Sequence, residues 1–123
     1  MTSKVLFLVF SKKTCPRNHA IRYALDLHNK GHIARIILEG PATWGLKELS
    51  DPHSEFAKLF LEALEKGLVA GACRAASSRR CSGNDCADVS AIAQSRGIAL
   101  LDDADGHASI EPYVREGYQV VVF

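Results

Sequence analysis

The chain has 123 residues, of which 47% are hydrophobic and 24% are charged, and its formal net charge is +1. This length is enough for one domain whose core needs no disulfide or metal, and the composition is that of a water-soluble globular protein. A net charge so close to zero argues against nucleic-acid binding by bulk electrostatics. We therefore expect one domain over residues 1–123, with no nucleic-acid partner.

No apolar stretch in the sequence is long enough to cross a membrane, so no membrane association is expected. The N-terminal segment MTSKVLFLVFSKK has only a six-residue apolar run and no small-residue cleavage site, which argues against a signal peptide. We therefore expect a cytoplasmic protein whose four cysteines are reduced. Thiols in that compartment are more often catalytic, metal-binding or structural than bridged.

The N-terminal third of the chain predicts a strand, a helix and a second strand. Residues 5–10 are a continuous apolar run, which is typical of a strand buried on both faces of a parallel sheet. A polar loop is predicted over 11–18, and apolar residues at helical spacing predict a helix over 19–30. The second strand is predicted at 33–38, and the segment 39–51 is expected to be irregular.

The middle of the chain repeats this alternation. A helix is predicted over 52–66, where Pro52 suits the first turn. A strand follows at 68–73. After a loop, Asn84 is a favourable N-cap for a helix that ends at Arg96, and residues 98–101 predict the fourth strand.

An acid-rich loop is predicted over 102–107, followed by a short helix that begins at Ser109 or Glu111 and ends at Glu116. A fifth strand is predicted at 118–123. Four predicted helices end in a charged residue followed by a glycine, and a predicted strand comes directly after each. These glycines are Gly31, Gly67, Gly97 and Gly117. Successive βα units with right-handed crossovers predict a three-layer α/β/α sandwich with a mainly parallel five-stranded sheet.

In such a sheet the loops that follow strands all lie at one edge, where ligands and chemistry collect. We therefore expect Cys15, Cys73 and His107 to gather at this edge. Cys73 ends the third strand, and the guanidinium groups of Arg79 and Arg80 can hold a nearby thiol as thiolate. The alternative interpretation of Cys73 is a buried core residue, because free cysteine is among the most buried residue types.

The other cysteines and His107 have weaker assignments. Cys15 is expected just before the first helix, whose N-terminus would favour a thiolate. Cys81 is close enough to Cys73 in sequence to act as a resolving thiol, and His107 could be a base or hydrogen-bond partner for the thiol. For Cys15 and His107 the alternative is a loop residue with no role. Cys86 shares the apolar face of its predicted helix and is interpreted as core.

Metal or ligand binding by Cys73, Cys81 and His107 is the main alternative to thiol chemistry. The cysteine spacings lack the paired C-x-x-C knuckle that is usual in structural zinc sites. No G-x-G-x-x-G or Walker loop follows the first strand, so no nucleotide cofactor is expected. An oligomeric binding module, or an interaction subunit without chemistry, therefore stays open as an alternative.

The segment CRAASSRRC and the ending GHASIEPYVREGYQVVVF resemble the DsrE/TusD-like family of small sulfur-relay proteins. The likeness covers nearly the whole chain as an order of elements. Its most specific part is a strand-end cysteine followed by two alanines and an arginine pair, here Cys73, Ala75, Ala76, Arg79 and Arg80. Where relay members typically continue with glycine, this chain has Cys81.

The resemblance implies that Cys73 accepts a persulfide sulfur from a donor protein and passes it to an acceptor protein. It also implies a sulfur-carrier or sulfurtransferase activity without a cofactor, and assembly into homotrimers or hexamers. A partner must reach the sulfur, so we expect Cys73 in an exposed, mobile loop. The small residues from Ala75 to Ser78 would leave room for that approach, and the arginines would stabilise the thiolate.

Overall fold

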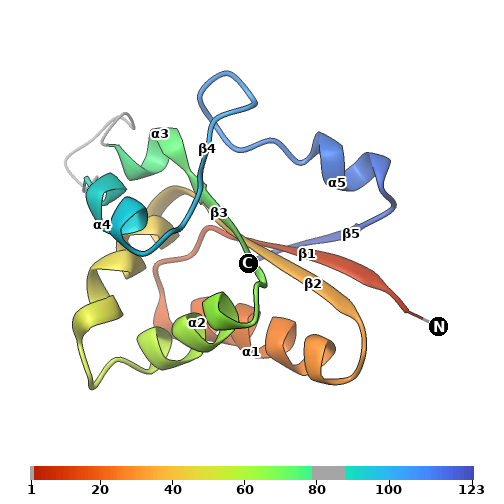
Figure 1. Cartoon of the computed structure of the whole chain (residues 1–123), viewed down its shortest axis with the longest axis horizontal. Helices are drawn as coiled ribbons and strands as arrows, with labels where there is room; N and C mark the ends of the chain where they lie inside the picture. Colours follow the sequence, from red (N-terminus) through yellow and green to blue (C-terminus); the bar gives the residue numbers. More distant parts are fainter. Residues whose placement is uncertain (1, 79–87) are drawn as a thin grey trace.

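The computed structural model describes residues 2–78 and 88–123. Five parallel strands form one sheet in the order β4-β3-β2-β1-β5 (Figure 1). The strands are β1 (Lys4–Val9), β2 (Ile33–Leu38), β3 (Val69–Cys73), β4 (Leu100–Leu101) and β5 (Gln119–Val122). The helices are α1 (Thr14–Asn29), the 3-10 helix η1 (Gly40–Ser50), α2 (Glu55–Glu65), α3 (Arg74–Ser77), α4 (Ser90–Ser95) and α5 (Glu111–Arg115).

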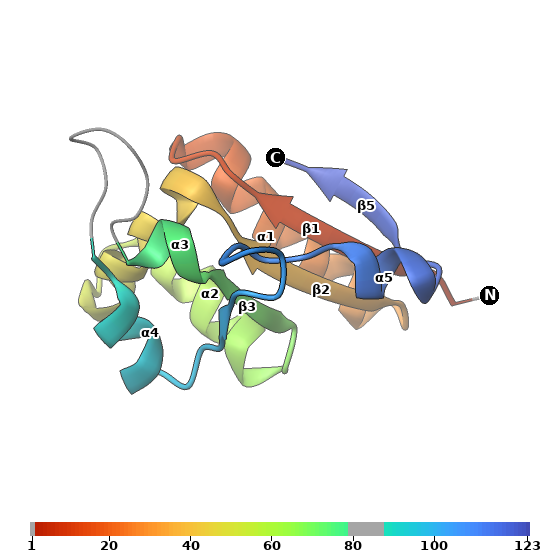
Figure 2. The ribbon, with the colours of Figure 1, turned by 90° about the horizontal axis from the view of Figure 1, so that it is seen from above.

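Both faces of the sheet are covered by other parts of the chain. Alternate residues of β1 point to opposite faces, and each set packs in a different hydrophobic cluster. Val5, Phe7 and Val9 join a core that includes apolar residues of α1, α2, η1 and α4. Leu6 and Leu8 face the other way and pack with residues of α5 and its flanking segments. Figures 1 and 2 show α1 and α2 together on one side of the sheet, with α5 apart from them. The expected parallel, five-stranded α/β/α architecture is confirmed.

The strand order decides which strand-end loops become neighbours. In the register of the sheet, Leu38 pairs with Ala72 and Cys73 pairs with Leu101. The chain therefore leaves β2, β3 and β4 at three adjacent places on one edge. The end of β1 lies beyond β2, two strands away from β3.

The predicted loop over 11–18 is wrong, because α1 already begins at Thr14. Pro16 is in its first turn, where a backbone N–H would have no partner within the helix and its absence costs nothing. The first helical hydrogen bond runs from the Arg17 N–H to the Lys13 carbonyl at 3.1 Å. Cys15 consequently lies inside the first turn of the helix and not before it.

The segment 39–51 is not irregular, since most of it forms η1. Gly40 enters it with a positive φ of 47°, which suits glycine, and Pro41 occupies the first turn. Ala42, Leu46 and Leu49 are buried at a spacing of three to four residues, and they join the main core. Burial of this apolar face holds the segment in helical form.

β4 is shorter than predicted, and residues 74–77 directly after β3 form a helix and not a loop. The N–H of Ile98 donates to the carbonyl of Ala93 at the end of α4, at 2.8 Å. Ile98 is thereby used to end the helix and only Leu100 and Leu101 pair with β3. After Cys73 the chain turns directly into α3. Asn84 and Cys86, to which the sequence assigns a cap and a core position, lie outside the described residues.

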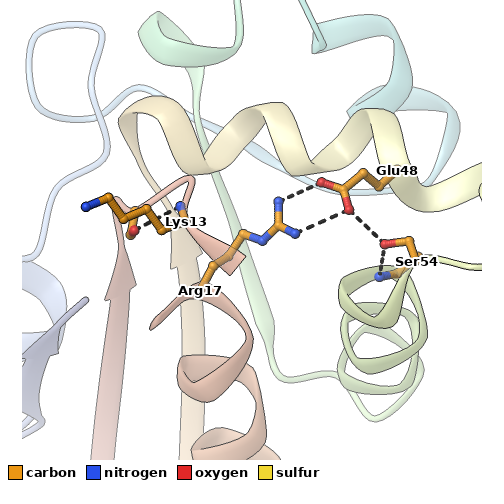
Figure 3. A network of polar contacts seen from close by, with 6 residues as sticks. Lys13, Arg17, Glu48 and Ser54 are labelled. Carbon is orange, nitrogen blue, oxygen red and sulfur yellow. Dashed lines mark hydrogen bonds and ion pairs between the residues drawn. The ribbon is translucent and has the colours of Figure 1, made fainter. Parts of the chain in front are cut away.

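A polar network joins α1, η1 and α2 (Figure 3). The buried guanidinium of Arg17 donates to both carboxylate oxygens of Glu48, at 2.7 and 3.2 Å. It also lies 4.1 Å from the centre of the Phe56 ring. Glu48 accepts a further bond from the Ser54 hydroxyl at 2.8 Å, and Ser54 caps α2 through the Ala57 N–H at 3.0 Å. These partners allow a buried arginine to keep its charge.

In the part of the chain that the structure describes, no helix has the length and apolar character needed to span a membrane.

Candidate functional site

A pocket of about 220 Å³ opens at the carboxyl edge of the sheet. Segments that follow four of the strands line it. They contribute Phe10 after β1, Glu39 and Gly40 after β2, Cys73, Ala75 and Ala76 from β3 and α3, and His107 after β4. The walls are mostly apolar, and within the described lining the titratable groups are one carboxyl, one thiol and one imidazole.

Cys73 and His107 meet in this pocket. The Cys73 Sγ lies 3.6 Å from the His107 Nδ1, a hydrogen-bonding distance for sulfur. The structure thus places Cys73 beside the loop after β4, at the edge opposite the glycine turns. A thiol and an imidazole in contact are the two parts of an activated nucleophile.

The expectation that Cys73 lies in an exposed, mobile loop is wrong. The residue is 1% exposed. Ala75 and Ala76 after it are also buried, and the N–H of Ala75 donates to the carbonyl of Gly106 at 3.1 Å. The small residues therefore serve close packing of α3 against the 102–107 loop, and do not leave open space around the thiol.

A tight turn positions His107. Backbone bonds of 2.8 and 3.0 Å join Ala104 and His107 in both directions. Asp105 and Gly106, between them, have positive φ values of 55° and 88°. His107 is itself exposed, while the thiol that it contacts is buried. Its imidazole can therefore exchange protons with solvent and pass them to or from the pocket.

Glu39 is the third chemical group of the pocket, and the sequence assigned it no role. It directly follows β2, and its N–H donates to the carbonyl of Val9 at 2.8 Å. Burial raises the pKa of its carboxyl group, while the Cys73 thiol and the charge of His107 act to lower the pKa. Its Oε1 is buried without a hydrogen-bond partner among the residues that the structure describes. The sequence signal that could have predicted this role is an acidic residue directly after β2, the strand that lies next to β3.

Cys15 is not brought to Cys73. It is exposed in the first turn of α1. Of the chain between β1 and α1, Phe10 lines the pocket and Cys15 does not. The Cys15 Sγ lies 3.5 Å from the His19 Nδ1, which is also 2.8 Å from the carbonyl oxygen of Cys15. That nitrogen donates to the carbonyl, so it is not free to take a proton from the Cys15 thiol.

Arg79, Arg80 and Cys81, the remaining predicted site residues, lie outside the described residues. Within 2–78 and 88–123, no group of three or more histidine, cysteine and acidic side chains is arranged to hold a metal ion. The alternative set of Cys73, Cys81 and His107 includes one residue that is not described. What the described residues do assemble is a thiol between an imidazole and a carboxyl group, in a small and mostly apolar pocket.

Comparisons of the chain with models of protein families, with curated proteins and with solved structures found no match.

Proposed function

We propose that the protein is a sulfur carrier or sulfurtransferase that holds sulfane sulfur as a persulfide on Cys73. The observation that carries this proposal is the contact of 3.6 Å between the Cys73 Sγ and the His107 Nδ1 inside a pocket. A thiol is a weak nucleophile until it loses its proton, and an adjacent imidazole is the usual group that takes it. The likeness of the segment around Cys73 to sulfur-relay proteins supports the same chemistry.

In the proposed reaction His107 Nδ1 first takes the thiol proton of Cys73. The thiolate attacks the terminal sulfur of a donor persulfide, R–S–SH, and forms a new S–S bond. The S–S bond of the donor breaks, and its electron pair leaves with the donor thiolate, RS⁻. One neutral sulfur atom moves from donor to Cys73, so no oxidant or reductant is consumed. Attack by an acceptor thiolate on the outer sulfur of Cys73 reverses the sequence and releases the sulfur.

The pocket suits the product of this reaction. A persulfide extends the side chain by one S–S bond of about 2.05 Å, a small addition beside a pocket of about 220 Å³. Because Cys73 itself is buried, the outer sulfur is the atom that an acceptor would meet in the pocket. The apolar walls formed by Phe10, Ala75 and Ala76 limit the access of water to it.

Two further parts of the proposal concern the setting of the protein. Assembly into a homotrimer or hexamer is supported by exposed apolar side chains, among them Tyr23, Val114 and Val122. Light scattering on the purified protein would test it, and a monomer at working concentration would count against it. The other part is a cytoplasmic location with donor and acceptor proteins as partners. The free thiols of Cys15 and Cys73 support it.

The test of the proposed function is sulfur loading. The protein is incubated with a cysteine persulfide donor, and added sulfur is mapped to peptides by mass spectrometry. We expect one sulfur on Cys73 in the wild type and none on that peptide in Cys73→Ser. Cys15→Ser is the matched control, because Cys15 also has a histidine within 3.5 Å but is exposed, and this variant should load normally. Equal loading of the wild type and Cys73→Ser would contradict the proposal.

A further inference from the structure

We propose that Glu39 is the proton donor to the leaving group in thiol chemistry at Cys73. This inference rests on the proposed function, because it assigns a further catalytic residue to the same site. It also favours a donor whose reacting sulfur group enters the pocket without a negative charge and whose leaving thiolate needs a proton. No sequence motif points to this role for Glu39.

The geometry places Glu39 where such a donor would bind. Its carboxyl group and the Cys73 thiol line one pocket, so a compound attacked by the thiol lies beside the carboxyl group. The buried Oε1 has no hydrogen-bond partner in the described part of the chain. A buried polar atom without a partner is costly unless something satisfies it. A leaving sulfur that exchanges a proton with this carboxyl group would do so during the reaction.

The two proton-carrying groups beside Cys73 lie in different environments. His107 is exposed and can return its proton to solvent, which suits a base. Glu39 is half-buried, and burial raises the pKa of its carboxyl group, which favours the protonated form that an acid needs. Sites whose environments separate two titratable groups in this way have distinct acid and base residues. Among the described residues that line the pocket, none carries a lysine or arginine charge that would bind an anionic donor.

The proposed step balances as follows. His107 Nδ1 takes the proton of Cys73, and the thiolate attacks a sulfur of the donor. As the donor S–S bond breaks, its electron pair moves to the leaving sulfur, which takes the proton from the carboxyl group of Glu39. Glu39 ends as carboxylate and His107 as imidazolium. Transfer of a proton through solvent from His107 to Glu39 restores the starting state.

Two small uncharged reagents separate this role from others. Methyl methanethiosulfonate and dimethyl disulfide both place a methylthio group on Cys73, so they form the same product. The first releases methanesulfinate, a weak base that leaves without a proton. The second releases methanethiolate, whose conjugate acid has a pKa of at least about 8.5, as for cysteine, so it benefits from an acid. The rate of each reaction is followed at the Cys73 peptide by quenched mass spectrometry.

With dimethyl disulfide at neutral pH, Glu39→Gln should react about a hundredfold more slowly than the wild type, the lower end of what a general acid contributes. With methyl methanethiosulfonate the two proteins should react at similar rates. His107→Asn, which lacks the base, should slow both reagents. Glu65→Gln, an exposed glutamate at the end of α2, is the matched control and should change neither rate.

A measurement on the wild type alone keeps the proposal testable if Glu39→Gln does not fold. The ratio of the two rates removes the effects of Cys73 and His107, because both reactions use the same nucleophile and base. This ratio, dimethyl disulfide over thiosulfonate, should fall as rising pH ionises Glu39. A ratio that is independent of pH would overturn the assignment, as would equal slowing or equal acceleration of both reagents in Glu39→Gln. If Cys73 accepts persulfide sulfur while the ratio is flat, the proposed function survives and this inference fails.

Discussion

Glu39 and Glu48 lie near the two ends of η1, and the pKa values of their carboxyl groups are shifted in opposite directions. Burial raises the pKa of both carboxyl groups. At Glu48 the hydrogen bonds from Arg17 and Ser54, and the charge of Arg17, outweigh burial and lower the pKa. At Glu39 the Cys73 thiol and the charge of His107 also lower the pKa, but burial outweighs them and the pKa stays raised. The partners of each side chain, and not its depth alone, decide which carboxyl group is available as an acid.

The raised pKa of Glu39 predicts a pH-dependent cost to stability. The folded state holds this proton more tightly than the unfolded chain, for which the pKa is 4.5. The contribution of Glu39 to stability is therefore greatest below pH 4.5 and is lost as pH rises through the folded pKa. We expect Glu39→Gln to gain stability relative to the wild type as pH rises from 4.5 through the folded pKa, as measured by urea unfolding. A difference that does not change with pH would show that Glu39 is not perturbed.

At the scale of elements, the contact between β3 and β4 holds the 102–107 loop against the thiol. A Cβ added at Gly71 of β3 would lie 2.5 Å from the Ala99 carbonyl oxygen and 2.8 Å from the Leu101 side chain. Only glycine allows the two strands to approach this closely. Arg74, directly after β3, adds an ion pair of 2.9 Å with Asp102 on the loop. β4 therefore positions the imidazole of His107 although only two of its residues pair with β3.

Gly71→Ala should push β4 and its loop away from β3. We expect a loss of about 1–3 kcal/mol in the free energy of unfolding, as for other overpacked sites. We also expect faster alkylation of Cys73 by iodoacetamide, because the cover over the thiol loosens. Gly67→Ala is the control, since nothing lies within 4 Å of its added Cβ. This substitution costs stability only because alanine disfavours the positive φ of 75° at this position. It should lose about 1 kcal/mol without a comparable increase in alkylation.

On the scale of the whole molecule, polar contacts stabilise the helical face at one place where three elements meet. Arg17 on α1, Glu48 on η1 and the α2 cap Ser54 form one network, with Phe56 packed under the guanidinium. An arginine as buried as Arg17 is expensive to leave without its partner. The network therefore links the last turn of η1 to the two helices that cover the sheet.

This network predicts acid sensitivity. The pKa of Glu48 is lower in the folded state than the ordinary 4.5, so its stabilisation is present above pH 4.5 and is lost as pH falls through the folded pKa. Glu48→Gln should cost about 1–2 kcal/mol at neutral pH, a figure reduced because the side chain is 38% exposed, and less in acid. Glu62→Gln, which breaks only an exposed pair with Lys66, should cost less than about 0.5 kcal/mol. Chemical denaturation at two pH values measures both, and equal costs would contradict the assigned role.

The sequence by itself determined the order of strands and helices along the chain and the parallel sheet. It did so because hydrophobic spacing and the glycines that end helices, such as Gly31 and Gly97, act over short distances. It also placed Cys73 and His107 at the edge of the sheet where they meet, since all parallel strands deliver their ends to one side. The same reasoning placed Cys15 at that edge, but could not show that β1 stands two strands away from β3.

Only the tertiary structure decided that Cys73 is buried and that Glu39 shares its pocket. Both depend on which strands are neighbours and on contacts between distant segments, such as Ala75 with Gly106 and β3 with β4. Strand order follows from the packing of whole surfaces, to which every segment contributes and which no local pattern records. Local signals therefore located the thiol, whereas the fit of separate segments determined how deeply it lies and which acid stands beside it.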